Sequence, residues 1–356
     1  MKIFIDTGHP GHIHLFKNFA NIMENNGHKV LITTRQKEVE VQLLQAYKLD
    51  YKLLGPHYKK KLLKGFSLIK YSLLVYLEAR KFKPDVFLSH GSIYAAWVSK
   101  FLKKPHISFE DTGNNEQVRL YLPFTDVVLT SSVFPKEYGV KQIRYLGHHE
   151  TAYLYPHYFN PNDSIYKYLK IDKNTKYAII RFIAWNASHD IGQSGMNNKL
   201  KKEVIEMLEM NGYRIFISSE AKLPEKYSKF QISIPPEMMH DALYFADIFV
   251  GEGATMAMEA GVLGTASFYV NSLVRSYCQD LESFGLCSNF SNSEGVLEKL
   301  EKVIQTEDMK GVYRKRASIF LSQKIDVTAF TVWFIENYPE SVSIMRENPN
   351  YQLRFK

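Results

Sequence analysis

Near its start the chain places several histidines between glycines, in the segment Asp6-Thr-Gly-His-Pro-Gly-His-Ile-His14. Imidazole exchanges protons near neutral pH, so a histidine such as His12 could act as an acid or base on a substrate. Gly8 and Gly11 would let the backbone approach that substrate closely. The alternative is a turn whose histidines only pack and hydrogen-bond. No metal is expected, because Asp6 is the one acidic residue nearby and no thiolate accompanies it.

A second polar segment, Arg181-Phe-Ile-Ala-Trp-Asn-Ala-Ser-His-Asp-Ile-Gly-Gln-Ser-Gly195, combines a cation, an indole, amides and hydroxyls. This set suits a pyrophosphate and a nucleobase. Arg181 would neutralise phosphate charge, and Asn186, Ser188 and His189 would supply hydrogen bonds. An ordered surface loop without a ligand is the alternative.

The third segment, Gly251-Glu-Gly-Ala-Thr-Met-Ala-Met-Glu-Ala-Gly-Val-Leu-Gly264, follows an apolar run. A helix that begins near Ala254 would direct backbone N–H groups from Gly253 to Thr255 at phosphate oxygens. Glu259 lies four residues after Thr255, so both would share one helix face, where a carboxylate could accept the hydroxyls of a ribose. The alternative for Glu259 is a surface salt bridge.

Short apolar runs alternate with amphipathic stretches, which predicts parallel strands joined by crossover helices. The expected strands are 2–6, 29–34, 51–54, 85–89, 106–109 and 126–131, then 177–182, 213–218, 247–251 and 266–269. The helix after the histidine segment is expected at 15–26, and the stretch 293–338 is expected to be helical. The three polar segments then follow strands at their carboxyl ends, where doubly wound sheets bind ligands.

The predicted fold class is therefore α/β, with two Rossmann-like doubly wound parallel-sheet domains facing across a cleft. The 356 residues suit two domains, expected at 1–150 and 165–325, with an irregular connection at 147–164. The remaining 326–356 would form a C-terminal helix and tail that can return to the N-terminal domain.

Composition favours a cytoplasmic protein. Two cysteines are too few for a disulfide framework, the first residues lack a secretory signal, and no apolar run is long enough to span a membrane. The net charge of +8 favours anionic partners. Much of this charge lies in the segment from Lys59 to Lys83, where basic residues alternate with Leu, Ile and Phe. We expect either the solvated face of a packed helix or peripheral contact with the inner face of an anionic membrane.

These segments resemble the glycosyltransferase-B (GT-B) superfamily, which includes the UDP-GlcNAc 2-epimerases and the GlcNAc transferase of peptidoglycan synthesis. Gly8-His-Pro-Gly-His12 is similar to the Gly-His segment of that transferase, which implies that His12 contacts or deprotonates the acceptor. The third segment is similar to the Gly-x-x-x-x-x-Glu-Ala element, which implies that Glu259 binds the ribose. Trp185-Asn-Ala-Ser-His-Asp190 together with Gly253-Ala-Thr-Met256 resembles a functionally uncharacterised branch of this superfamily.

The chain also departs from its resemblances. Ser89-His-Gly-Ser92 lacks the acid of the epimerases' Gly-Asp-Thr, and Ile183-Ala-Trp-Asn186 replaces their His-Arg-Arg-Glu. Glu110 and Glu116 nevertheless fall roughly where those enzymes keep acidic residues. The glycine-rich phosphate loop of the transferase is absent after Phe182.

The resemblance implies a metal-independent glycosyltransferase that moves a sugar from a nucleoside diphosphate sugar to a cell-envelope polysaccharide or glycolipid. The N-terminal domain would face the glycan or lipid-linked acceptor, and the C-terminal domain would bind the nucleotide. His12 would be the base, with Glu110 and Glu116 as alternatives. Beyond the sugar nucleotide we expect no cofactor and no nucleic-acid partner. Two other classes stay open: a nucleotide-sugar epimerase or hydrolase that uses Glu110 and Glu116, and a basic, non-enzymatic protein that binds polyanions.

Overall fold

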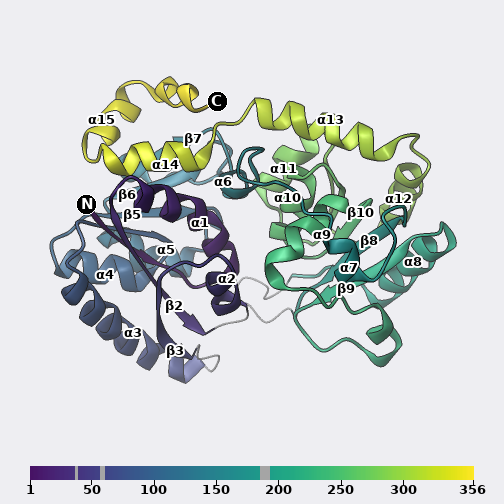
Figure 1. The fold of residues 1–356 in the computed structure, drawn as a ribbon, viewed down its shortest axis with the longest axis horizontal. Coiled ribbons are helices and arrows are strands. Elements are labelled where there is room, and N and C mark those ends of the chain that lie inside the picture. Colours follow the sequence, from purple (N-terminus) through teal and green to yellow (C-terminus); the bar gives the residue numbers. More distant parts are fainter. Residues whose placement is uncertain (37–38, 57–60, 185–192) are drawn as a thin grey trace. The chain divides into compact units, whose positions relative to one another are not determined.

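The computed structural model describes residues 1–36, 39–56, 61–184 and 193–356, with the backbone alone for 61–66. The chain divides into two compact units (Figure 1). Unit 1 comprises Met1–Tyr153 together with Lys324–Lys356, and unit 2 comprises Leu154–Gln323. The last part of the chain therefore belongs to the same unit as its beginning.

Unit 1 is built on a seven-stranded sheet with the order β3-β2-β1-β4-β5-β6-β7, in which every neighbouring pair is parallel. Its strands are β1 (Lys2–Asp6), β2 (Lys29–Gln36), β3 (Tyr51–Pro56), β4 (Val86–His90), β5 (His106–Glu110), β6 (Val127–Ser131) and β7 (Gln142–Tyr145). The central strands β4, β5 and β6 are buried along their whole length. Most of their residues are apolar or small, as in parallel strands covered on both faces, and the exceptions are His90, His106 and Glu110.

The helices that join these strands are α1 (Pro10–Asn25), α2 (Glu40–Ala46), α3 (Lys61–Phe82), α4 (Ile93–Phe101) and α5 (Asn115–Tyr121). Helix α6 (Thr151–Leu154) follows β7, where the chain passes from unit 1 to unit 2. Val75 and Ala79 of α3 and Val98 of α4 pack on Phe4 and Phe87 of the sheet. The C-terminal helices α14 (Val327–Glu336) and α15 (Glu340–Glu347) complete the unit and end in a 3-10 segment, Pro349–Phe355.

Unit 2 contains a five-stranded sheet with the order β12-β11-β10-β8-β9, again parallel throughout. Its strands are β8 (Tyr177–Phe182), β9 (Arg214–Ser219), β10 (Ile248–Gly251), β11 (Ala266–Val270) and β12 (Cys287–Phe290). Its helices are α7 (Ile165–Leu169), α8 (Asn198–Met210), α9 (Met239–Phe245), α10 (Ala254–Val262), α11 (Ser276–Ser283), α12 (Val296–Ile304) and α13 (Met309–Ser322). The predicted α/β class with two parallel sheets is confirmed. Within the described ranges, no helix has the length and apolar character that crossing a membrane requires.

One boundary differs in a way that matters for the site. Helix α1 begins at Pro10, five residues before the predicted start at 15. Proline suits the first helical position because its missing N–H would have no partner there, and the His9 side chain caps the helix by accepting a hydrogen bond from Gly11 N. His12 and His14 therefore lie on the first turns of a helix rather than in a loop, so their side chains point to different surroundings.

Candidate active site

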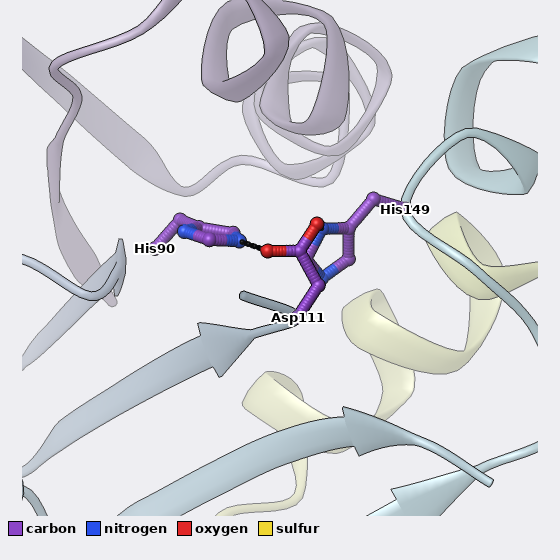
Figure 2. Close-up of side chains that lie close together, drawn as sticks. All are labelled: His90, Asp111 and His149. Atoms are coloured by element: carbon purple, nitrogen blue, oxygen red, sulfur yellow. Dashed lines mark ion pairs between the residues drawn. The ribbon is translucent and has the colours of Figure 1, made fainter. Parts of the chain in front are cut away.

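Four polar side chains gather at the carboxyl ends of the unit 1 strands. His12 follows β1, His90 ends β4, Asp111 follows β5, and His149 lies beyond β7. His90 Nε2 is 3.0 Å from Asp111 Oδ1, and His149 Nδ1 is 3.2 Å from Asp111 Oδ2. Figure 2 shows the Asp111 carboxylate between the two imidazoles. We call His90, Asp111 and His149 the histidine–aspartate cluster.

Aromatic contacts tie this cluster to His12. The His12 ring stacks on His90 with centroids 4.5 Å apart, and the His149 ring meets His90 edge-on at 4.6 Å. His9 lies 5.8 Å from His12, ring to ring. His14 points elsewhere, toward the hydroxyl of Tyr47. Of the three histidines in the first polar segment, His12 is therefore the one that joins the cluster.

Burial and the charges of neighbouring groups shift the pKa values of the cluster in opposite directions. Burial disfavours the charged form of each group, whereas an opposite charge nearby favours it. Asp111 would be penalised by burial, but the two imidazoles more than offset this and hold its pKa well below the ordinary value. Burial also opposes charge on His90, yet the carboxylate raises the pKa of that imidazole. His149 pairs with the same carboxylate, but burial outweighs the attraction and lowers its pKa. Burial first, and then the neighbouring His90, lower the pKa of His12 well below its usual value.

The loop before His12 is fixed by a buried ion pair. Arg35 NH1 donates to Asp6 Oδ1 at 2.7 Å, and Arg35 NH2 donates to the carbonyl of Thr7 at 2.6 Å. A Cβ on Gly8 would lie 3.0 Å from Arg35 NH2, which leaves little room for a side chain there. Ser92 also donates to Asp6, so this carboxylate fixes the loop.

The two glutamates predicted as alternative catalytic groups have different surroundings. Glu110 is buried at the end of β5, where Oε1 accepts from Thr112 N at 2.8 Å and Gly113 N at 2.7 Å and Oε2 accepts from Tyr121. Those contacts favour a role in shaping the following turn. Glu116 is exposed in the first turn of α5.

In unit 2, the turn between β10 and α10 lies against Arg181 of β8. A Cβ on Gly251 would lie 2.9 Å from Arg181 Cβ and 2.6 Å from Phe249 Cζ, so the strand end needs glycine. Gly253 precedes the first residue of α10, Ala254, and lies within 3.6 Å of Arg181 when a Cβ is added. The start of α10 therefore lies against the aliphatic part of the Arg181 side chain, and its backbone N–H groups form the part of this turn that suits an anion.

Arg181 is held in position by neighbouring polar groups. NH1 donates to Ser218 Oγ at 2.7 Å, and NH2 donates to Glu220 Oε1 at 2.8 Å. The other Glu220 oxygen accepts from Ala184 N at 3.2 Å. The side chain is consequently pre-ordered at the carboxyl end of β8.

Glu259 is buried on α10 and does not form the surface salt bridge considered as its alternative. Its Oε1 lies 3.0 Å from His240 Nε2 of α9. Thr255, one turn earlier on the same helix, is half-buried. A buried, oriented carboxylate behind a helix N-terminus can accept hydroxyl hydrogen bonds strongly because little water competes for it.

Glu252 carries a structural role that the sequence did not indicate. Its carboxylate accepts from Ile183 N at 3.2 Å and from Met196 N at 3.0 Å, and it pairs with Lys201 at 3.1 Å. Burial raises its pKa, although Lys201 opposes that effect. Glu252 thus holds both ends of the second polar segment. Asn186, Ser188 and His189 lie outside the described residues.

The residue pattern does not indicate the histidine–aspartate cluster directly, because its members are far apart in the chain. His90 stands within Ser89-His-Gly-Ser92, and Asp111 follows Glu110 directly, so both were adjacent to noted residues. For His90 and Asp111 the usable signal is that each follows a predicted buried strand, since the carboxyl ends of neighbouring parallel strands meet.

The chain belongs to the family described as "Protein of unknown function (DUF354)", whose model matches residues 1–284. An uncharacterised protein of Methanocaldococcus jannaschii is 24% identical over 295 residues, which cover 77% of this chain and 83% of that protein. These matches fit the uncharacterised branch that the motifs indicated.

Solved structures share the fold at low sequence identity. The UDP co-structure of MnaA from S. aureus has a TM-score of 0.69 at 13% identity, covering 96% of this chain and 98% of that one. UDP-GlcNAc 2-epimerase from Neisseria meningitidis, bound to UDP-GlcNAc, has a TM-score of 0.66 at 14% identity, covering 89% and 94%. The glycosyltransferase SsfS6 of Streptomyces sp. SF2575 has a TM-score of 0.57 at 15% identity, covering 95% and 100%. The expected resemblance to GT-B glycosyltransferases and UDP-GlcNAc 2-epimerases is therefore confirmed.

Proposed function

We propose that this protein transfers a sugar from a nucleoside diphosphate sugar to a glycan or lipid-linked acceptor of the cell envelope. The observation that carries the proposal is the unit 2 strand end, where the start of α10 lies beside Arg181 and a buried Glu259 follows one turn later. A helix start suits a pyrophosphate, and a buried carboxylate suits the hydroxyls of a ribose. Similar structures hold UDP or UDP-GlcNAc, which supports a nucleotide-sugar donor.

In this scheme unit 2 handles the leaving group. The guanidinium of Arg181 and the amides of Gly253 to Thr255 would neutralise the charge that develops on the pyrophosphate. Glu259, oriented by His240, would accept the ribose hydroxyls. The residues Asn186, Ser188 and His189 keep their proposed role toward the nucleotide.

Unit 1 would handle the acceptor through His12. Its Nδ1 accepts a hydrogen bond from Gly8 N at 3.3 Å, a long contact that an acceptor hydroxyl could replace. The hydroxyl would then donate to Nδ1 and pass its proton there as the sugar bond forms. Gly8 and Gly11 keep the backbone close to that position.

The second candidate is a nucleotide-sugar epimerase or hydrolase, favoured by the similarity to UDP-GlcNAc 2-epimerases. It would need a carboxylate as acid or base, and the internal contacts of Glu110 make that residue less suited to the task. Incubation with UDP-GlcNAc and no acceptor separates the classes. A new sugar isomer or free sugar would favour the second candidate.

A lipid-linked acceptor is supported by the outer face of α3. Ile69, Leu73 and Leu77 recur every four residues and are 72%, 55% and 42% exposed, and Phe101 of α4 is 73% exposed. The basic residues Lys70, Arg80 and Lys81 lie on the same helix. Apolar side chains among cations suit an anionic membrane surface, which they would enter while the cations contact headgroups.

Sedimentation with liposomes tests this membrane contact. We expect binding to anionic vesicles and little binding to neutral ones, with loss of binding in the variant that combines Ile69→Ser, Leu73→Ser and Leu77→Ser. Lys299→Glu with Lys302→Glu, on unit 2, is the charge-changing control. Equal sedimentation of wild type and the triple variant would show that this face of α3 does not contact the membrane.

Calorimetric titration tests the proposed function itself. A panel of UDP, GDP, TDP and UDP-GlcNAc should contain at least one ligand that binds. Glu259→Gln should weaken the binding of that ligand by about 1–3 kcal/mol, because it impairs a charged hydrogen bond. Glu220→Gln, which alters the support of Arg181 instead, should have a smaller effect. Unchanged affinity in a folded Glu259→Gln protein would overturn the ribose assignment.

A further inference from the structure

We propose that His90, Asp111 and His149 form a binding site for a divalent transition-metal ion, of which Zn²⁺ is the natural probe. Each residue offers one ligand atom, and these atoms all lie within 4.8 Å of one another. The inference goes beyond the proposed transfer reaction and departs from the sequence-based expectation of no metal. The cluster includes residues far from the first polar segment in the chain, at positions 90, 111 and 149.

The spacing of the side chains matches a metal site. In a tetrahedral site with bonds of about 2.0–2.1 Å, ligand atoms are about 3.3 Å apart. Here His90 Nε2 lies 3.0 Å from Asp111 Oδ1 and His149 Nδ1 lies 3.2 Å from Asp111 Oδ2, and one ligand atom of each residue falls within 4.8 Å of the other two. Small side-chain rotations would therefore suffice to admit an ion among them.

Unmet bonding capacity within the cluster points to a missing ligand. His149 Nε2 and Asp111 Oδ1 are both buried and have no hydrogen-bond partner in the described part of the chain. His90 Nε2 lies 3.0 Å from Asp111 Oδ1 and forms a charge contact with it. Buried polar atoms are almost always satisfied, so two orphans in one cluster need an explanation. A bound cation would accept a lone pair from such an atom and so supply the partner that the atom lacks.

The donor set selects the class of ion. Two imidazole nitrogens and one carboxylate oxygen suit Zn²⁺ and its first-row neighbours better than Ca²⁺ or Mg²⁺, which prefer oxygen ligands. Three protein ligands leave a coordination position for water or for a substrate oxygen, as in catalytic rather than structural zinc sites. When bound, the ion would act as a Lewis acid toward such an oxygen.

Surrounding residues would hold the ligands in place. His90 ends a strand that is buried throughout, and its ring is covered on one face by His12. His149 packs edge-on against Phe109 at 5.5 Å. The ligands thus come from ordered segments, which limits the entropy that metal binding must overcome.

The competing explanation is a proton-sharing His–Asp–His relay that binds no ion. Calorimetry with Zn²⁺ on the full-length, chelator-treated protein at pH 7.5 distinguishes them, with Co²⁺ absorption as an independent readout of tetrahedral coordination. We expect one tight site per chain, and at least about a 100-fold loss of Zn²⁺ affinity in His149→Ala and in His90→Gln, because each removes a ligand. The matched control is His240→Gln, which breaks a buried histidine–carboxylate pair outside the cluster.

Two results would overturn the proposal: no tight Zn²⁺ site in the folded wild-type protein, or equal affinity in wild type and both cluster variants. Circular dichroism confirms folding in each case, and either cluster variant alone suffices if the other fails to fold. Nucleotide titrations run with a chelator keep this test separate from the proposed function. Nucleotide binding without Zn²⁺ binding would refute only the metal site, and the reverse would refute only the donor site.

Discussion

The two units use the same parallel-sheet architecture to present different chemistry at their strand ends. In unit 1, four side chains that titrate converge from the ends of β1, β4, β5 and β7, and His12 stacks on His90. In unit 2, backbone N–H groups at a helix start lie beside Arg181, and the buried carboxylates of Glu252 and Glu259 each have a partner. The fold alone thus determines where a site lies, whereas the residues at the strand ends determine what kind of chemistry it supports.

A physical reason for the difference is visible in the space each strand end leaves. Gly251 is buried and has no room for a Cβ, so its backbone packs directly against Phe249 and Arg181. The strand ends of unit 1 carry the large polar side chains of His90, Asp111 and His149. We therefore expect unit 1 to be sensitive to loss of side chains and unit 2 to be sensitive to their addition.

The largest expected effect is on turnover, from removing a unit 1 side chain. His12→Ala should lower kcat by about 100-fold or more, because a positioned base contributes that much to proton transfer. Donor affinity should hardly change, because the nucleotide is assigned to unit 2. Steady-state kinetics and donor titration measure the two quantities. His14→Gln, on the same helix but directed toward Tyr47, is the control. Lost donor affinity with normal turnover would reverse the assignment of the two units.

The converse experiment adds a methyl group to unit 2. Gly251→Ala should reduce the free energy of unfolding by about 1–3 kcal/mol, because its Cβ would lie 2.6 Å from the buried ring of Phe249. Gly253→Ala is the matched control: its nearest neighbour would be 3.5 Å away, in ordinary contact. Urea denaturation measures both. If the two variants lose equal stability, the close approach at Gly251 is not what the strand end requires.

Much of this architecture could be predicted from sequence, and the limits have physical causes. Strands such as β8 were predicted to the residue because apolar runs bounded by polar segments are distinctive. Strand β7 was missed because its Gln and Arg side chains interrupt the apolar pattern. The third polar segment was singled out correctly as a strand, a glycine turn and a helix. The contact of His149 with His90 and Asp111 could not be predicted, because His149 follows the interrupted strand β7 and approaches the other two only through the order of the strands.

A third test compares how the two units respond to acid. Burial lowers the pKa of His106, in the unit 1 core, to about 3. Its ring lies 2.9 Å from both Ser89 Oγ and Thr125 Oγ1. The folded chain keeps this ring neutral, whereas the unfolded chain takes up a proton below about pH 6.5. Between these values the unfolded state binds more protons, so stability present above pH 6.5 is lost as the pH falls toward 3.

Because of His106, the free energy of unfolding should therefore fall by about 2 kcal/mol when the pH is lowered from 7 to 5. Urea denaturation at both pH values should show that loss in wild type and a smaller loss in His106→Gln. His157→Gln, at an exposed position of unit 2, should leave the pH dependence unchanged. Hydrogen exchange should place the acid-induced opening in unit 1. An identical pH dependence in wild type and His106→Gln would show that this buried imidazole is not what makes unit 1 sensitive.

The smallest effect is expected on nucleotide affinity, from removing the hydroxyl of Thr255 near the start of α10. Thr255 lies one turn before Glu259 on α10 and is half-buried, so its hydroxyl can contribute one hydrogen bond to a bound nucleotide. Thr255→Val keeps the shape and should weaken nucleotide binding by about 1 kcal/mol, roughly fivefold, the usual net value of one such bond. Calorimetry of wild type, Thr255→Val and Thr255→Ser separates the hydroxyl from the methyl group. Serine should bind like wild type. If serine binds as weakly as valine, packing at this position matters more than the hydroxyl, and the donor site would rest on the backbone amides, Arg181 and Glu259 alone.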